Sequence, residues 1–138
     1  MKPSAAVAKN DKLTRIYSVE ADFADAKQDL LDAIADKGLV LSYTAYAKAM
    51  FDRTANIAGG KKPVYDNAEI VLFCKADLSH DLVQAAPHNL ILCPYAIAIY
   101  VLHKEPKRVY LSFREQDKSQ PVTKPITELL QQIIDDVI

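Results

Sequence analysis

The chain has 138 residues, half of them apolar and a quarter charged, and its 17 basic and 18 acidic side chains leave a formal net charge of −1. This length fits one globular domain, and this composition excludes a low-complexity disordered chain. The balanced charge argues against a basic face that binds nucleic-acid phosphates.

The first twelve residues are polar and show no periodicity, so residues 1–12 are predicted to form a flexible N-terminal arm and residues 13–138 a single α+β domain. No apolar run reaches the roughly 18 residues that a membrane span needs. We expect a periplasmic protein if a leader has been removed from this chain, and a cytoplasmic one otherwise. The sequence leaves both locations open.

Hydrophobic periodicity predicts the elements in chain order. They are a strand over 13–20, a helix over 22–37, a strand over 39–43, a helix over 45–57, a strand over 68–75, a short helix ending at 86, a hairpin of strands over 95–104 and 108–115, and a final helix from 126. Asp22, Thr44, and Asp77 or Ser79 are expected to cap the first three helices. The order indicates a mostly antiparallel sheet of about five strands with an N-terminal and a C-terminal packing helix, a β-α-β4-α-like fold with short inserted helices.

The strand over 95–104 carries the most informative pattern. Ile97, Ile99 and Val101 alternate with Ala98 and Tyr100, so both faces of this strand are apolar. An antiparallel sheet with one wet face alternates apolar with polar residues instead. Helices can cover one face, and the other then needs further helices, an apolar ligand or a second subunit. We expect a homodimer.

Residues that could carry chemistry are few. The sequence has no HExxH, CxxC, GxSxG or Rossmann glycine pattern, so we expect a protein that is not an enzyme. Cys74 and Cys93 lie in apolar stretches, where free buried thiols are common, although a disulfide between them stays open. No spacing among the histidines and cysteines predicts a zinc site.

His80 lies on the predicted helix that ends at Ala86. At about 100° per residue it projects away from the apolar side formed by Leu78 and Leu82. It is either an exposed histidine or a ligand directed at a pocket or partner subunit, because a neutral imidazole is a common axial ligand of haem iron.

Most of the chain beyond residue 13 resembles the family known as domain of unknown function 302. The resemblance is carried by Lys37-Gly38-Leu39-Val40, Met50, Arg53-Thr54, Asn67-Ala68-Glu69, Phe73-Cys74-Lys75-Ala76, Leu78-Ser79-His80, Cys93-Pro94-Tyr95, Ile97, Tyr100 and Val109-Tyr110-Leu111. It implies a fold similar to that of the TATA-box-binding protein, commonly as a dimer. Some related proteins of sulfur-oxidising bacteria are understood to be dimers that bind haem and small gases.

The chain departs from related sequences at Tyr46, where histidine is frequent. If that histidine is an iron ligand elsewhere, this chain uses Tyr46 or His80, or binds no haem. Tyrosine does ligate haem iron in catalases. The structural reading of Tyr46 is an aromatic residue that packs on the sheet at the start of a helix.

The leading hypothesis is therefore a non-enzymatic homodimer that holds haem b near the subunit interface and takes up a diatomic gas. His80 is the first candidate for the metal ligand and Tyr46 the second, while Met50 and Phe51 form an apolar wall and Arg53 pairs with a propionate. Two alternatives remain: a cofactor-free structural or interaction protein, and a thiol-redox protein that uses Cys74 and Cys93.

Overall fold

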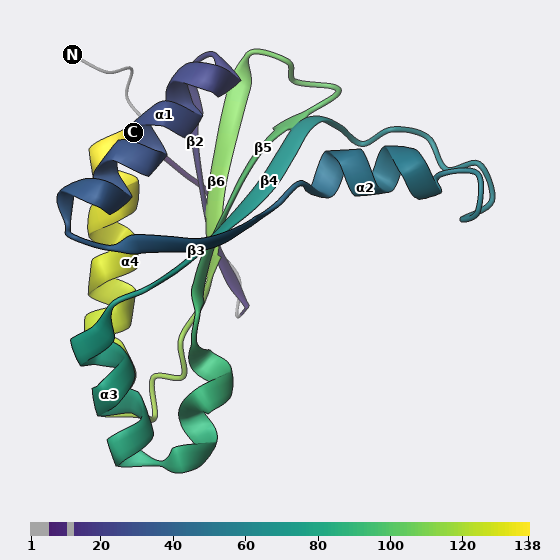
Figure 1. The fold of residues 1–138 in the computed structure, drawn as a ribbon. Coiled ribbons are helices and arrows are strands. Elements are labelled where there is room, and N and C mark those ends of the chain that lie inside the picture. Colours follow the sequence, from purple (N-terminus) through teal and green to yellow (C-terminus); the bar gives the residue numbers. More distant parts are fainter. Residues whose placement is uncertain (1–5, 11–12) are drawn as a thin grey trace.

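The computed structural model describes residues 6–10 and 13–138, which form one antiparallel sheet and a set of helices (Figure 1). The strands are β1 Ala6–Asn10, β2 Thr14–Glu20, β3 Val40–Ala45, β4 Tyr65–Cys74, β5 Tyr95–Leu102 and β6 Arg108–Arg114. The helices are α1 Phe23–Asp36, α2 Ala47–Thr54, α3 Ala76–Ala85 and α4 Lys124–Val137, with 3₁₀ turns η1 Pro87–Leu92 and η2 Pro121–Thr123. The predicted α+β class and its antiparallel sheet are confirmed.

The N-terminal segment differs from the prediction. Ala6–Asn10 form β1, which pairs antiparallel with β2, whereas residues 1–12 were expected to be a flexible arm. Residues 1–5 and 11–12 lie outside the described part of the chain. The free edge of β2 offers unpaired backbone groups, and those groups can order a short segment without a periodic sequence of its own. The sheet accordingly has six strands instead of about five, in the order β1-β2-β6-β5-β4-β3.

Two predicted boundaries also shift. The strand before α2 runs through Ala45, so Tyr46 and not Thr44 is the N-cap residue of that helix. β4 begins at Tyr65, three residues before the predicted start. In both places backbone pairing with a neighbouring strand extends the element: Thr44 pairs with Val71, and Tyr65 pairs with Leu102.

Three helices cover one face of the sheet. Figure 1 places α1, α3 and α4 on the same side, and the core lies between them and the sheet. Ile97 and Ile99 of β5 are fully buried on this side, as are Ile133 and Ile134 of α4. The apolar stripe that predicted the final helix is its buried face.

The other side of the sheet, here called the open face, carries α2 alone among the described helices (Figure 1). Its strand residues alternate with the core residues, and most of them are only half-buried: Ile70, Leu72, Cys74, Ala96, Ala98, Tyr100, Leu102, Tyr110 and Ser112. At the β3 edge, Val40 is 76% exposed and Tyr43 65% exposed. Both faces are apolar, as the β5 pattern predicts, but the helices cover one of them. No helix within the described ranges is long and apolar enough to cross a membrane.

Candidate functional site

A hollow of about 770 Å³ lies on the open face beside α2, and we call it the α2 hollow. The sheet supplies its floor through Ile70, Ala98 and Ser112, which come from three adjacent strands. The small side chains of Ala98 and Ser112 leave open space above this floor. Tyr46 and Met50 lie beside that space. The volume falls in the range typical of small-molecule sites.

Aromatic rings form a continuous row from α2 across the open face. The ring of Phe51 stacks on that of Tyr65 with centroids 6.1 Å apart, and Tyr65 meets the edge of Tyr100 at 5.8 Å. Tyr100 then stacks on Tyr110 at 5.5 Å. Offset and edge-on pairs of this kind hold ring orientations fixed. Three rings of the row, those of Phe51, Tyr65 and Tyr100, line the hollow and give it a preorganised aromatic wall.

Tyr46 stands at the mouth of the α2 hollow and is 59% exposed. Lys27 of α1 lies at this edge of the sheet, next to the end of β3. Its ammonium lies 2.7 Å from a carboxylate oxygen of Glu69 and 5.6 Å from the centroid of the Tyr46 ring. The phenol thus faces the hollow with a cation close to its ring.

Arg53 lines the same hollow from the last turn of α2. Within residues 6–10 and 13–138 it has no carboxylate partner, so its planar guanidinium is available to an anion. Tyr46, Met50, Phe51 and Arg53 are thus brought together, as the sequence pattern suggests.

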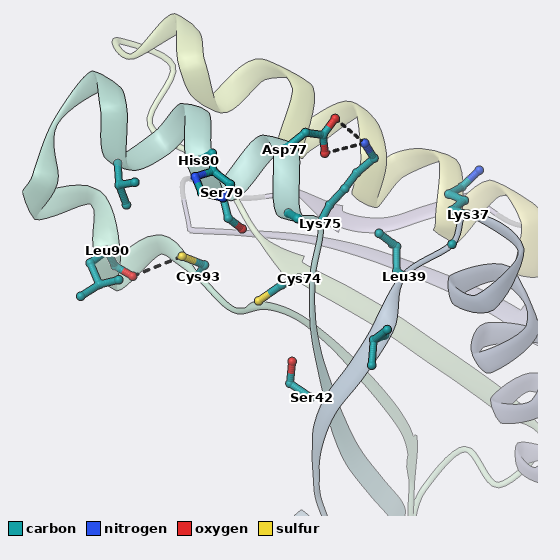
Figure 2. A pocket seen from close by; sticks show the side chains of 14 residues that line it. Lys37, Leu39, Ser42, Cys74, Lys75, Asp77, Ser79, His80, Leu90 and Cys93 are labelled. Carbon is teal, nitrogen blue, oxygen red and sulfur yellow. Dashed lines mark hydrogen bonds and ion pairs between the residues drawn. The ribbon is translucent and has the colours of Figure 1, made fainter.

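His80 lies elsewhere. It lines a second hollow of about 720 Å³, here called the α3 hollow, between the β3 edge and the first turns of α3 (Figure 2). His80 is exposed, in agreement with its expected position opposite Leu82. The five predicted site residues therefore do not form one site, because the end of β4 that leads to α3 is not the end on which α2 packs.

An ion pair lines the α3 hollow, and another lining residue, Ser79, belongs to a hydroxyl pair with a core tyrosine. The buried Tyr95 places its hydroxyl 3.2 Å from that of Ser79, and burial raises the pKa of Tyr95 although this hydrogen bond opposes the shift. Lys75 contacts both carboxylate oxygens of Asp77 at 2.7 Å, which lowers the pKa of Asp77 (Figure 2). α3 begins at Ala76 with Lys75 as its N-cap residue, so Asp77 and Ser79 both lie within the helix and the prediction that one of them caps it is wrong.

Both cysteines line the α3 hollow as free thiols. Cys93 donates to the carbonyl oxygen of Leu90 at 3.4 Å, while Cys74 projects from the end of β4 (Figure 2). His103, which follows β5, contacts Asp66 of β4 at 2.7 Å, and His88 is exposed in η1. Across the described ranges, no group of three or more His, Cys, Asp and Glu side chains is arranged to hold a metal ion.

Sequence reasoning missed Tyr65 and Tyr110 as partners of the site. Tyr65 precedes the predicted start of its strand, and Tyr110 looks like an ordinary alternating strand residue. Their link to Tyr100 depends on the register of three adjacent strands. The positions of Tyr100 and Tyr110 between the core residues of β5 and β6 are the one signal that could have indicated the row, because they put both rings on the open face.

Comparison with known proteins identifies the family and the fold of this chain. A family model described as "Domain of unknown function DUF302" matches residues 15–137. The chain belongs to the DUF302 family. The fold agrees: the crystal structure of an uncharacterized conserved DUF302 protein from Bacillus stearothermophilus superposes with a TM-score of 0.75, over 91% of this chain and 98% of that one, at 10% sequence identity. No curated protein matches the chain. At this identity the similarity to another DUF302 protein shows the shared fold and names no ligand.

Proposed function

We propose that this DUF302 protein is a non-enzymatic homodimer that holds haem, or a ligand equally flat and apolar, in the α2 hollow. The observation that carries the proposal is the aromatic row beside a hollow of about 770 Å³ on the sheet face without further helix cover. Flat apolar ligands bind where rigid rings offer a wall and a few polar groups fix the orientation.

The residues of the α2 hollow fit haem in three respects. Met50 and Phe51 are 39% and 50% exposed and offer apolar contact. The guanidinium of Arg53 suits a propionate, since its fork can donate to both oxygens. Tyr46 places its phenol at the mouth of the hollow, beside the ammonium of Lys27. A phenolate oxygen is a known haem ligand.

These contacts favour Tyr46 over His80 as the iron ligand, because Arg53, Met50 and Phe51 share a hollow with Tyr46 and not with His80. Haem iron with one protein ligand offers its remaining position to a diatomic gas. The role of this chain's residues is then to bind the macrocycle, orient its carboxylates and exclude water from one side.

The test is a haem titration of the purified protein followed by the Soret band, with Tyr46→Phe and His80→Ala as a matched pair of variants. Tyr46→Phe keeps the ring and removes the candidate ligand oxygen, so it is expected to shift the band, while His80→Ala leaves it unchanged. The reverse result moves the ligand to the α3 hollow. Absence of any Soret shift in the wild-type protein rejects haem and favours a cofactor-free dimer.

The α3 hollow supports a second candidate, a thiol-redox function, because Cys74 and Cys93 line the same hollow as free thiols. Oxidised glutathione would accept two electrons and two protons from the two thiols. The thiols would become one disulfide, and the oxidised glutathione would become two molecules of reduced glutathione. Thiol titration before and after exposure to oxidised glutathione decides this. A loss of two thiols per chain supports the disulfide, and an unchanged count rejects it.

A further inference from the structure

The segment over residues 47–64, here called the arm, comprises α2 and the turn that follows it. Figure 1 shows it standing out from the sheet, joined to β3 and β4 at its base. None of the residues of α2 is buried. Beyond Phe51, which meets Tyr65, the arm exposes Ile57 at 87% and Val64 at 60%. A helix that contributes no buried residue to the core of its own subunit has an apolar side that can pack against another surface.

The open face is the apolar surface that this chain itself exposes next to the arm. Tyr43 is 65% exposed on it and lines the α2 hollow, while Val40 is 76% exposed further along β3, where it lines the α3 hollow. The arm is tied at both ends to the β3 and β4 edge, so it lies beside its own open face and not across it. A second copy can bring its arm over this face.

The charge of the arm limits which surfaces of two copies can meet. The arm carries four basic residues and one acidic residue: Lys48, Arg53, Lys61, Lys62 and Asp52. The arm therefore has a net charge of +3. Because the whole chain has a net charge of −1, the rest of the chain has a net charge of −4. The shared positive charge disfavours contact between the arms of two copies.

The exposed apolar area is of the size that a dimer needs. A stable interface buries roughly 800 Å² on each partner. The arm and the open side of the β3 edge expose seven large apolar side chains by 39–87% each: Val40, Tyr43, Tyr46, Met50, Phe51, Ile57 and Val64. Together they amount to several hundred Å², more than scattered surface residues require.

We propose that the arm of each subunit packs over the open face of a second copy of the chain and closes its partner's α2 hollow. The two contacts are equivalent under a two-fold axis, as in most homodimers. Each ligand site is then built from two chains: the floor and Tyr46 from one subunit and the cover from the arm of the other. This inference rests on the homodimer of the proposed function and specifies which segment of the partner completes the site.

The interface is tested without ligand by sedimentation equilibrium. Ile57→Asp places a carboxylate on the exposed tip of the arm, where it leaves the fold intact and weakens dimerisation at least about tenfold, because the buried charge would have no partner. Leu13→Asp is the control, since Leu13 is 76% exposed at the start of β2 on the side of the core residues. A monomeric wild-type protein, or an Ile57→Asp variant that dimerises as tightly as Leu13→Asp, overturns the proposal.

Mixing two variants tests whether the cover comes from the partner. Tyr46→Phe removes the candidate ligand oxygen and Ile57→Asp disables the arm, so each alone is expected to lose the wild-type Soret band. A mixed dimer rebuilds one complete site, from the hollow of the Ile57→Asp chain and the arm of the Tyr46→Phe chain, and recovers the band for one site per dimer. If wild-type protein binds haem and the mixture recovers nothing, the shared site is wrong. If wild-type protein binds no haem but dimerises through Ile57, the proposed ligand fails and the arm contact stands.

Discussion

The rings of Tyr100 and Tyr110 lie 10° from parallel with centroids 5.5 Å apart on adjacent strands of the open face. Burial raises the pKa of both phenols, and the hydroxyl of Tyr110 donates to the Glu105 carboxylate at 3.0 Å. The stack is thus held from two sides, by the β5–β6 register and by the turn between these strands. A rigid ring pair on a solvent-facing sheet contributes little to the core and is suited to contact a ligand.

Replacing Tyr100 should therefore affect ligand binding more than stability. Tyr100→Leu keeps apolar volume but interrupts the aromatic row, and we expect the haem dissociation constant to rise about two- to tenfold, from the loss of roughly 0.5–1.5 kcal/mol per ring pair. Fluorescence-quenching titration gives the constant. The matched control is Phe113→Leu, which breaks the Tyr17–Phe113 stack on the core side. That variant should lower the free energy of unfolding and leave haem affinity unchanged. Equal haem affinities of the two variants would show that the aromatic row does not contact the ligand.

Arg53 should recognise a carboxylate. We expect Arg53→Ala to weaken binding of protoporphyrin IX about tenfold or more, since a charge-assisted bidentate pair is lost, and Arg53→Lys to restore only part of it. The dimethyl ester of protoporphyrin IX is the control ligand, because it has the same ring and no negative charge. Its affinity should be the same for wild type and Arg53→Ala. A difference of equal size with the ester would mean that Arg53 acts through the shape of α2.

The sequence predicts those parts of the fold that local physics controls. The α4 stripe and the β5 alternation each follow from the period of one element, and both match the structure. The boundaries of β3 and β4 were harder to predict, because Thr44 and Tyr65 extend their strands through partners far away in the chain. No local pattern contains that information.

The candidate site shows the same division. Tyr46, Met50, Phe51 and Arg53 lie within eight consecutive positions on and beside one short helix, so their common location could be predicted. His80 could be placed correctly on the outer side of its own helix, but not relative to Tyr46. That relation depends on which end of β4 each helix adjoins, which is set by the whole sheet.

The raised pKa of Tyr100 predicts a loss of stability in alkaline solution. Its ordinary value is 10.0, and burial raises the value in the folded chain while the hydrogen bond with Ser112 partly opposes the shift. Below about pH 10 both folded and unfolded chains keep this proton, so its contribution is fully present there. Above that pH the unfolded chain releases the proton first, and stability falls as the pH rises through the folded-state pKa.

Urea unfolding between pH 9 and about 11.5 measures this effect, and absorbance near 295 nm follows phenolate formation directly. Tyr100→Phe should show a shallower fall than wild type, because the substituted ring cannot ionise. Tyr95 and Tyr110 also have raised pKa values and should keep part of the slope in that variant. A wild-type chain whose stability rises across this range would contradict the assignment.

The contact between Lys27 and Glu69 links α1 to the edge of the α2 hollow, so its loss should affect both stability and the site. The Lys27 Nζ lies 2.7 Å from Glu69 Oε1, and the Glu69 side chain is only 13% exposed. Lys27→Met leaves this carboxylate without its cation, and we expect a loss of about 1–3 kcal/mol in the free energy of unfolding, less than for a fully buried pair because Lys27 is itself 28% exposed. Adding Glu69→Gln to Lys27→Met should recover part of the loss, because a neutral amide needs no counter-charge, and a double-mutant cycle in urea gives the coupling. Additive effects of the two substitutions would show that the pair is too well solvated to hold α1 against the hollow.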